Sequence, residues 1–287
     1  MDWRQRRARF RAVLGGDGCV HPGSVFDPIS ARIAEDLGFA AGMFAGSTAS
    51  LTVLGAPDLI VLTLSEFAAQ AYRINRAGKL PLMVDADHGY GNALNVKRTV
   101  EELESAGVAA MTIEDTLLPR AYGEPKPQLI PIAEGVGKMR AALAGRQDPR
   151  LVVAGRTSAV QVTGIEDAIA RAKAYEAVGV DAMFFTGLKT RDQLAAVSSA
   201  IKLPVFLGSI DGELTDKAFL ASQRVRIALQ GHMPIMAAVR AVHDTLKALR
   251  EGTPPKQLTG VAPPELMKRV TRDADYGRWT KEFLGGE

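Results

Sequence analysis

The sequence predicts an α/β fold, a (β/α)8 barrel of the TIM type followed by an extra C-terminal helical segment. A helical pattern that ends at a glycine and leads at once into an apolar strand occurs three times, at residues 37–44, 106–113 and 178–185. The three glycines lie 69 and 72 residues apart, which is about two βα units each. Further apolar runs between the copies make strand and helix alternate about eight times. Nearly continuous apolar strands in such an alternation favour a closed parallel barrel over an open doubly wound sheet.

The expected strands can be placed in chain order. The first is residues 20–26, and the three repeated segments supply the second, fourth and sixth. The third, fifth, seventh and eighth are residues 80–84, 151–154, 204–207 and 225–229. Apolar residues at helical spacing fill the intervals, for example Val96, Val100 and Leu103 before Gly107. The open-sheet alternative is disfavoured because no Gly-x-Gly-x-x-Gly follows the first strand.

Two segments lie outside the repeat. Residues 116–131 contain four prolines and form a long loop of the kind that often serves as a lid. The tail after residue 250 carries two Pro-Pro pairs before a short helical pattern. We therefore expect a barrel catalytic domain over residues 1–250, including an N-terminal helix, and a C-terminal helical extension over 251–287 that packs on a partner subunit.

Charge and composition exclude several classes of protein. The chain has 287 residues, and 35 basic against 32 acidic side chains leave a net charge of only +3, so we expect no nucleic-acid partner. Residues 37–57 are uncharged, yet their glycines, serines and threonines indicate a buried strand and loop rather than a membrane span. A single cysteine, Cys19, excludes an intrachain disulfide and favours a reducing compartment. We expect a cytoplasmic protein without a secretory signal.

Polar residues that follow the expected strands mark the candidate site, because a barrel builds its active site at the C-terminal ends of its strands. Asp85 and Asp87 stand two apart at one strand end, and Glu114 ends a neighbouring strand. Three convergent carboxylates repel one another unless a cation lies among them, and oxygen ligands favour Mg²⁺ or Mn²⁺. The alternative is that these carboxylates only cap helices or accept hydrogen bonds from loop amides.

Three further strand ends carry groups suited to a carboxylate substrate. Arg156 offers a planar fork for bidentate binding, although an ion pair with the same acidic residues is an equal alternative. Gly46 and Ser47 form a small-residue turn whose amides and hydroxyl could hold a carboxylate, or an ordinary turn. His232 follows the last strand and precedes a helix over residues 235–249, where it serves either in proton transfer or only in packing.

The motifs resemble those of the isocitrate lyase and phosphoenolpyruvate mutase superfamily. The similarity runs in register from about residue 20 to 230, and the segments that carry it are residues 26–32, 55–59, 85–92, 113–115 and 156–157. The resemblance implies an α/β barrel, a bound Mg²⁺ and a 2-oxocarboxylate substrate that passes through an enolate. It also implies a homotetramer, a dimer of dimers in which C-terminal helices are exchanged between subunits.

The resemblance also assigns roles to individual residues. Asp85 matches the principal metal ligand, and the carboxylates that act directly or through waters match Asp58, Asp87 and Glu114. Ser47 and Arg156 match positions that hold the carboxylate and oxygen of the substrate.

Departures from the superfamily pattern narrow the expected reaction. Residues 119–123 stand where its lyases carry a loop with a proton-donating cysteine, and this loop has none. The lysine and asparagine by which phosphonate mutases steer a phosphoryl group are not matched in residues 123–127. Ser158 replaces the usual aspartate, and residues 206–209 lack the expected asparagine.

Enolate chemistry without a strong acid on the loop suits decarboxylation. The pattern is similar to the oxaloacetate decarboxylase branch, which has histidine at the position of His232. We therefore expect conversion of oxaloacetate, and of 3-alkyl oxaloacetates, to pyruvates and CO₂. The alternatives are a C–C bond lyase of the 2-methylisocitrate lyase type and a non-catalytic protein that binds 2-oxo acids.

Overall fold

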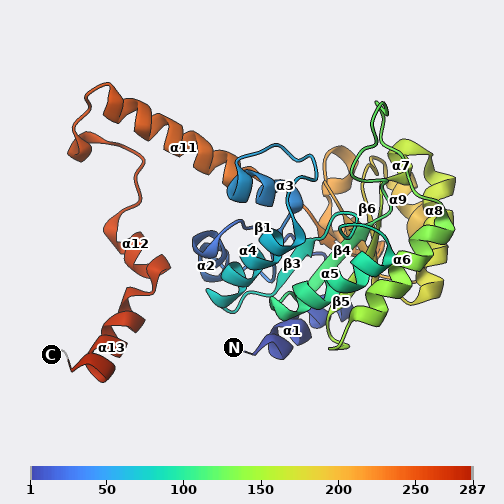
Figure 1. Cartoon of the computed structure of the whole chain (residues 1–287), viewed down its shortest axis with the longest axis horizontal. Coiled ribbons are helices and arrows are strands. Elements are labelled where there is room, and N and C mark those ends of the chain that lie inside the picture. Colours follow the sequence, from blue (N-terminus) through green and yellow to red (C-terminus); the bar gives the residue numbers. More distant parts are fainter. Residues whose placement is uncertain (1, 286–287) are drawn as a thin grey trace. The chain divides into compact units, whose positions relative to one another are not determined.

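A parallel sheet of eight strands forms the centre of the computed structural model, which describes residues 2–285 (Figure 1). The strands pair in chain order and are β1 (Gly23–Ser24), β2 (Gly42–Phe44), β3 (Leu82–Asp85), β4 (Ala110–Glu114), β5 (Val152–Thr157), β6 (Ala182–Phe185), β7 (Val205–Leu207) and β8 (Val225–Ala228). Val20 lies just before β1 and bridges Ile227 of β8 in parallel. Its N–H donates to Arg226 O at 3.0 Å, and its carbonyl accepts from Ala228 N at 3.0 Å. This bridge joins the first and last strands, so the expected barrel is confirmed.

Helices connect the strands as the alternation predicts. Before residue 232 the helices are α1 (Trp3–Gly15), α2 (Pro28–Asp36), α3 (Gly46–Ala49), η1 (Ser50–Leu54), α4 (Leu64–Arg76), α5 (Ala93–Ser105), α6 (Ile132–Gly145), α7 (Ala159–Val162), α8 (Ile165–Val178), α9 (Arg191–Ala200), η2 (Gly212–Thr215) and α10 (Lys217–Ser222). Side-chain capping boxes begin α2, α4, α5 and α9. The repeat glycines Gly38, Gly107 and Gly179 have φ values of 80°, 85° and 97°. They end α2, α5 and α8 in the left-handed region that glycine adopts without strain, which explains the recurrence in the sequence.

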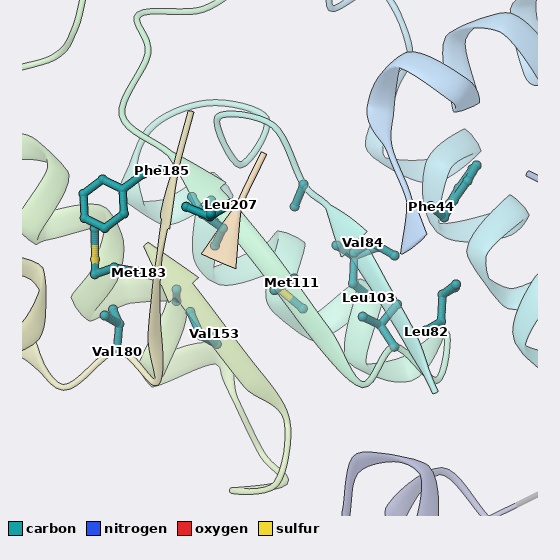
Figure 2. Packing of buried hydrophobic residues seen from close by; sticks show 14 of the residues in the cluster. Phe44, Leu82, Val84, Leu103, Met111, Val153, Val180, Met183, Phe185 and Leu207 are labelled. Carbon is teal, nitrogen blue, oxygen red and sulfur yellow. The ribbon is translucent and has the colours of Figure 1, made fainter. Parts of the chain in front are cut away.

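The strands bury both of their faces. Leu82 and Val84 of β3 join the apolar layer under the helices, which Figure 2 shows together with Met111 and Val153 of the next two strands. Met83, between them, faces the barrel interior because side chains alternate along a strand. This two-sided burial accounts for the nearly continuous apolar runs in the sequence.

Helix α1 covers the N-terminal end of the barrel. Phe10 is fully buried and enters the interior cluster, with its ring 6.5 Å from that of Phe206. Arg7 is also buried, and its guanidinium donates to Val108 O and Asp148 Oδ2, both at 3.1 Å. Arg11 pairs with Asp181 at 2.7 Å. Because these contacts occupy the N-terminal end, a ligand site is left to the C-terminal ends of the strands.

The chain divides into two compact units, and the second begins at His232. It contains α11 (Met233–Arg250), η3 (Pro255–Gln257), α12 (Pro264–Thr271) and α13 (Asp273–Leu284). This division lies before α11, whereas the boundary expected from the sequence lies after residue 250. Residues 37–57, which carry no charged side chain, include β2, α3 and η1. Among the described residues, no helix is long and apolar enough to cross a membrane.

Candidate active site

Acidic residues meet an arginine at the C-terminal ends of three adjacent strands. Asp85 ends β3, Glu114 ends β4, and Arg156 of β5 stands directly opposite Glu114 in the strand register. The Arg156 guanidinium donates a hydrogen bond to Asp85 Oδ2, and its Nε lies 3.5 Å from Glu114 Oε2. The ion pairs left open by the sequence analysis are therefore present, and they bring the candidate substrate group and the candidate ligands into one site.

Two threonines that the sequence analysis missed orient these carboxylates. Thr112 is fully buried in β4, and its hydroxyl donates to Asp85 Oδ1 at 3.1 Å. Thr116 donates to Glu114 Oε2 at 2.8 Å. The signal for Thr112 was available, because a polar residue two positions before Glu114 must face the same side of the strand.

Asp87 lies in a tight loop against the start of α3. Its φ is +46°, its N–H donates to Asp85 Oδ1 at 3.1 Å, and its carbonyl accepts from Glu114 N at 2.8 Å. A Cβ at Gly46 would stand 2.6 Å from both Asp87 carboxylate oxygens. Gly46 therefore permits a close approach that no other residue would, and Ser47 is the next residue of α3.

Negative charge exceeds positive charge in this site. Burial, then the charges of Asp85 and Glu114, raise the pKa of Asp87 well above its usual value. Burial also raises the pKa of Glu114, with Arg156 opposing the shift and Asp85 adding to it. Desolvation would lower the pKa of Arg156, but Asp85 and Glu114 outweigh it and raise that pKa. One guanidinium thus faces three carboxylates. A divalent cation bound among them would offset this excess of negative charge.

Two ring side chains beside the carboxylates carry polar atoms without protein partners. In the described part of the chain, neither Tyr90 Oη nor His88 Nδ1 has a hydrogen-bond partner, and both atoms are buried. Burial, then the charges of Asp87 and Asp85, raise the pKa of Tyr90. Burial, then Lys138, lower the pKa of His88 to about 4, so its imidazole is neutral near pH 7. A water molecule or a ligand in the site could form the hydrogen bonds that these two atoms lack within the protein.

The remaining expected residues lie further out or in the second unit. Asp58 is exposed, and its charge contributes to the raised pKa of Asp87. His232 is the N-cap residue of α11, where the second unit begins.

The acidic side chains fit a cation held largely through water. No three His, Cys, Asp or Glu side chains within residues 2–285 are arranged to hold one metal ion directly. Mg²⁺ commonly binds proteins through one or two carboxylates and keeps several waters. Asp85 as a direct ligand, with water linking the other carboxylates, is compatible with this geometry and with the surplus of negative charge.

Comparison with known proteins decides the family. The family model described as phosphoenolpyruvate phosphomutase matches residues 10–250. The chain belongs to this family. It is 63% identical to an oxaloacetate decarboxylase of Bradyrhizobium diazoefficiens over 285 residues, and 61% identical to one of Rhodopseudomonas palustris over 285 residues, in each case 99% of both chains. The resemblance drawn from the motifs is thereby confirmed.

Solved structures of the phosphoenolpyruvate phosphomutase and isocitrate lyase superfamily share the fold. Oxaloacetate acetylhydrolase with the inhibitor 3,3-difluorooxalacetate matches with a TM-score of 0.85 and 27% identity, covering 98% of each chain. Phosphonopyruvate hydrolase with oxalate and Mg²⁺ matches with a TM-score of 0.85 and 28% identity, covering 97% of this chain and 99% of the other.

Proposed function

We propose that this protein is a divalent-metal-dependent oxaloacetate decarboxylase that forms pyruvate and CO₂. The observation that carries the proposal is identity of about 60% over almost the whole chain to proteins named oxaloacetate decarboxylase. The acidic residues beside Arg156, which suit a divalent cation, support the same proposal. The single cysteine of the chain supports a reducing compartment, so we place the reaction in the cytoplasm.

Arg156 has the chemistry to bind the 1-carboxylate of the substrate. Its side chain is 18% exposed, so it is reachable from the site, and Asp85 and Glu114 hold it charged. Bidentate guanidinium–carboxylate pairs are both strong and directional. We assign Gly46 and Ser47, on the Asp87 side, to the same carboxylate or to the adjacent 2-oxo oxygen.

A bound cation requires ligands on the acidic side of the site. We propose that Asp85 would be the principal protein ligand and that Asp87, Glu114 and Asp58 would act directly or through waters. When bound, Mg²⁺ or Mn²⁺ would polarise the 2-oxo group and stabilise the negative charge that develops there as CO₂ departs. The C3–C4 bond then breaks, its electron pair moves toward the C2 oxygen, and C3 accepts a proton to give pyruvate.

His232 is our candidate for the group that returns the proton. The chain reaches His232 four residues after β8 ends, and the oxaloacetate decarboxylase branch that the motifs resemble has histidine at this position. Imidazole transfers protons efficiently near neutral pH. Residues 116–131 contain no cysteine or histidine, so this loop offers no thiol or imidazole for that step.

The proposal is tested by following CO₂ and pyruvate release from oxaloacetate, with metal in buffer as the background. We expect rapid release with Mg²⁺, loss of release with EDTA, and recovery when excess Mg²⁺ or Mn²⁺ is added. His232→Ala should lower kcat by about a hundredfold, as expected for loss of a general acid. Release no faster than the metal background would contradict the decarboxylase. Cleavage of 2-methylisocitrate-like acids would then indicate a C–C lyase, and oxalate binding without any turnover would indicate a binding protein.

We also propose that the second unit associates with another copy of the chain. Helix α11 exposes a row of apolar side chains at helical spacing, Met236, Val239, Val242, Leu246 and Leu249. An apolar face of this length is typical of a helix that another surface covers. Light scattering on the intact protein should give the mass of a tetramer, and Val239→Asp together with Leu246→Asp should lower it. A monomeric mass for the unmodified chain would overturn this proposal.

A further inference from the structure

Within the expected lid segment of residues 116–131, residues 116–129 form a loop whose base is closed by backbone pairing. Leu117 N donates to Gln128 O at 2.8 Å, and an antiparallel bridge joins Thr116 to Leu129. Residues 119–127 between these pairs are exposed, and the green loop projects from the C-terminal rim in Figure 1. The base of the loop is therefore fixed, whereas its tip extends from the barrel.

One arginine of α8 contacts the chain at both ends of this loop. Arg171 Nη1 donates to Asp115 Oδ2 at 3.0 Å, before the loop, and to Ile130 O at 2.9 Å, after it. Ile130 N also donates to Asp115 O at 2.9 Å. Arg171 Nε donates to Asp167 Oδ2 at 2.8 Å, which fixes the plane of the guanidinium. A planar fork satisfies these partners together, whereas a single ammonium group could not.

Tyr175, one turn further along α8, supports the same carboxylate. Its hydroxyl donates to Asp115 Oδ2 at 2.8 Å. Both Tyr175 and Asp115 are fully buried, and Arg171 is 6% exposed. Charge-assisted hydrogen bonds are strong in such a setting, and removal of one partner leaves a buried charge incompletely satisfied.

The same contacts reach the candidate active site. Asp115 follows Glu114 directly, and its N–H donates to Arg156 O at 3.2 Å. Thr116, the first residue of the loop, donates its hydroxyl hydrogen bond to Glu114. A displacement at the base of the loop would therefore move the backbone that carries Glu114 and its hydrogen-bond partner.

We propose that Arg171, supported by Tyr175, is a positioning residue that clamps both ends of the loop at residues 116–129 and thereby sets its closure over the bound 2-oxo acid. The part concerning closure rests on the proposed function. The clamping of the loop does not, because it follows from contacts within this chain. Arg171 acts through Asp115 and Ile130 and touches no substrate.

Limited proteolysis measures the clamp without requiring turnover. Trypsin can cleave after exposed Arg120, whereas Lys126 is protected because Pro127 follows it. At a temperature well below unfolding, we expect Arg171→Lys to raise the rate of cleavage after Arg120 at least fivefold, and Tyr175→Phe to raise it about threefold. Addition of Mg²⁺ and oxalate, an unreactive dicarboxylate, should slow cleavage of the unmodified chain and slow that of Arg171→Lys much less. Lys173→Gln, on the exposed side of α8, is the matched control and should behave as the unmodified chain.

Steady-state kinetics separate positioning from a purely structural role. Arg171→Lys should raise KM for oxaloacetate about tenfold, because substrate retention is weakened. It should lower kcat less than threefold, because Glu114 shifts with the loop base whereas Asp85 remains in place. If Arg171→Lys lowers the melting temperature but leaves the rate of loop cleavage and KM unchanged, the clamp is wrong. If Arg171→Lys does not fold, the same measurements on Tyr175→Phe decide the question. If oxaloacetate is not turned over but cleavage after Arg120 accelerates, the clamp stands and the proposed function fails.

Discussion

Replacement of Asp85 with asparagine should lower kcat for oxaloacetate by about a thousandfold or more, equivalent to about 4 kcal/mol in the activation barrier. Asparagine keeps an oxygen that can accept hydrogen bonds from Thr112 and from the Asp87 amide, as Asp85 Oδ1 does. It removes the negative charge that we assign to the metal. Turnover should therefore fail although the hydrogen bonds to the Oδ1 position persist.

The stability of the same variant distinguishes loss of a ligand from loss of the fold. The charge of Asp85 contributes to the raised pKa of both Asp87 and Glu114. Its neutralisation in Asp85→Asn therefore relieves repulsion among buried carboxylates. This gain in stability offsets the loss of the ion pair between Asp85 and Arg156. We expect Asp85→Asn to melt near the temperature of the unmodified chain without metal, but to lose the rise in melting temperature that Mn²⁺ produces. Asp192→Asn, at an exposed position of α9, controls for the substitution itself. A fall in kcat of less than tenfold would remove Asp85 from the role of principal ligand.

The barrel and the rim of its site were predictable because both follow from periodic features of the sequence. Repeated C-cap glycines and two-sided apolar strands indicated the alternation, and the rule for strand ends selected Asp85, Glu114 and Arg156. Strand limits were less predictable, since they depend on partners far away in the chain. The first strand was expected over residues 20–26, but Val20 pairs with β8 to close the barrel, and the named strand β1 is only Gly23–Ser24.

Contacts between distant helices and loops could not be read from spacing. Tyr175 fits the apolar face of helix α8, and its spacing along the chain indicates only a packing role. Its hydroxyl contacts Asp115, 60 residues away in the chain. A local pattern gives the face of the helix on which a side chain lies, whereas the partner of its polar atom depends on how the barrel brings β4 and α8 together.

Replacement of Arg156 with glutamine should reduce both stability and activity, for one electrostatic reason. The guanidinium is paired with Asp85 and Glu114, and both acidic residues are buried. Removal of one partner from a buried ion pair costs about 3 kcal/mol or more. Without metal, we expect urea denaturation of Arg156→Gln to show a free energy of unfolding lower by about that amount. Arg140→Gln, at an exposed position of α6, should change it by less than about 0.5 kcal/mol.

Added metal and a second variant separate the charge of Arg156 from its geometry. Mn²⁺ supplies positive charge among the same carboxylates, so it should restore most of the stability lost in Arg156→Gln without restoring turnover. Arg156→Lys keeps the charge but loses the planar fork, so it should fold nearly as well as the unmodified chain while kcat/KM falls about a hundredfold, mainly through KM. If Arg156→Lys retains full kcat/KM, bidentate binding of the substrate carboxylate is wrong and Arg156 serves only to neutralise Asp85 and Glu114. If Mn²⁺ fails to stabilise Arg156→Gln, the carboxylates do not form the cation site on which the proposed reaction depends.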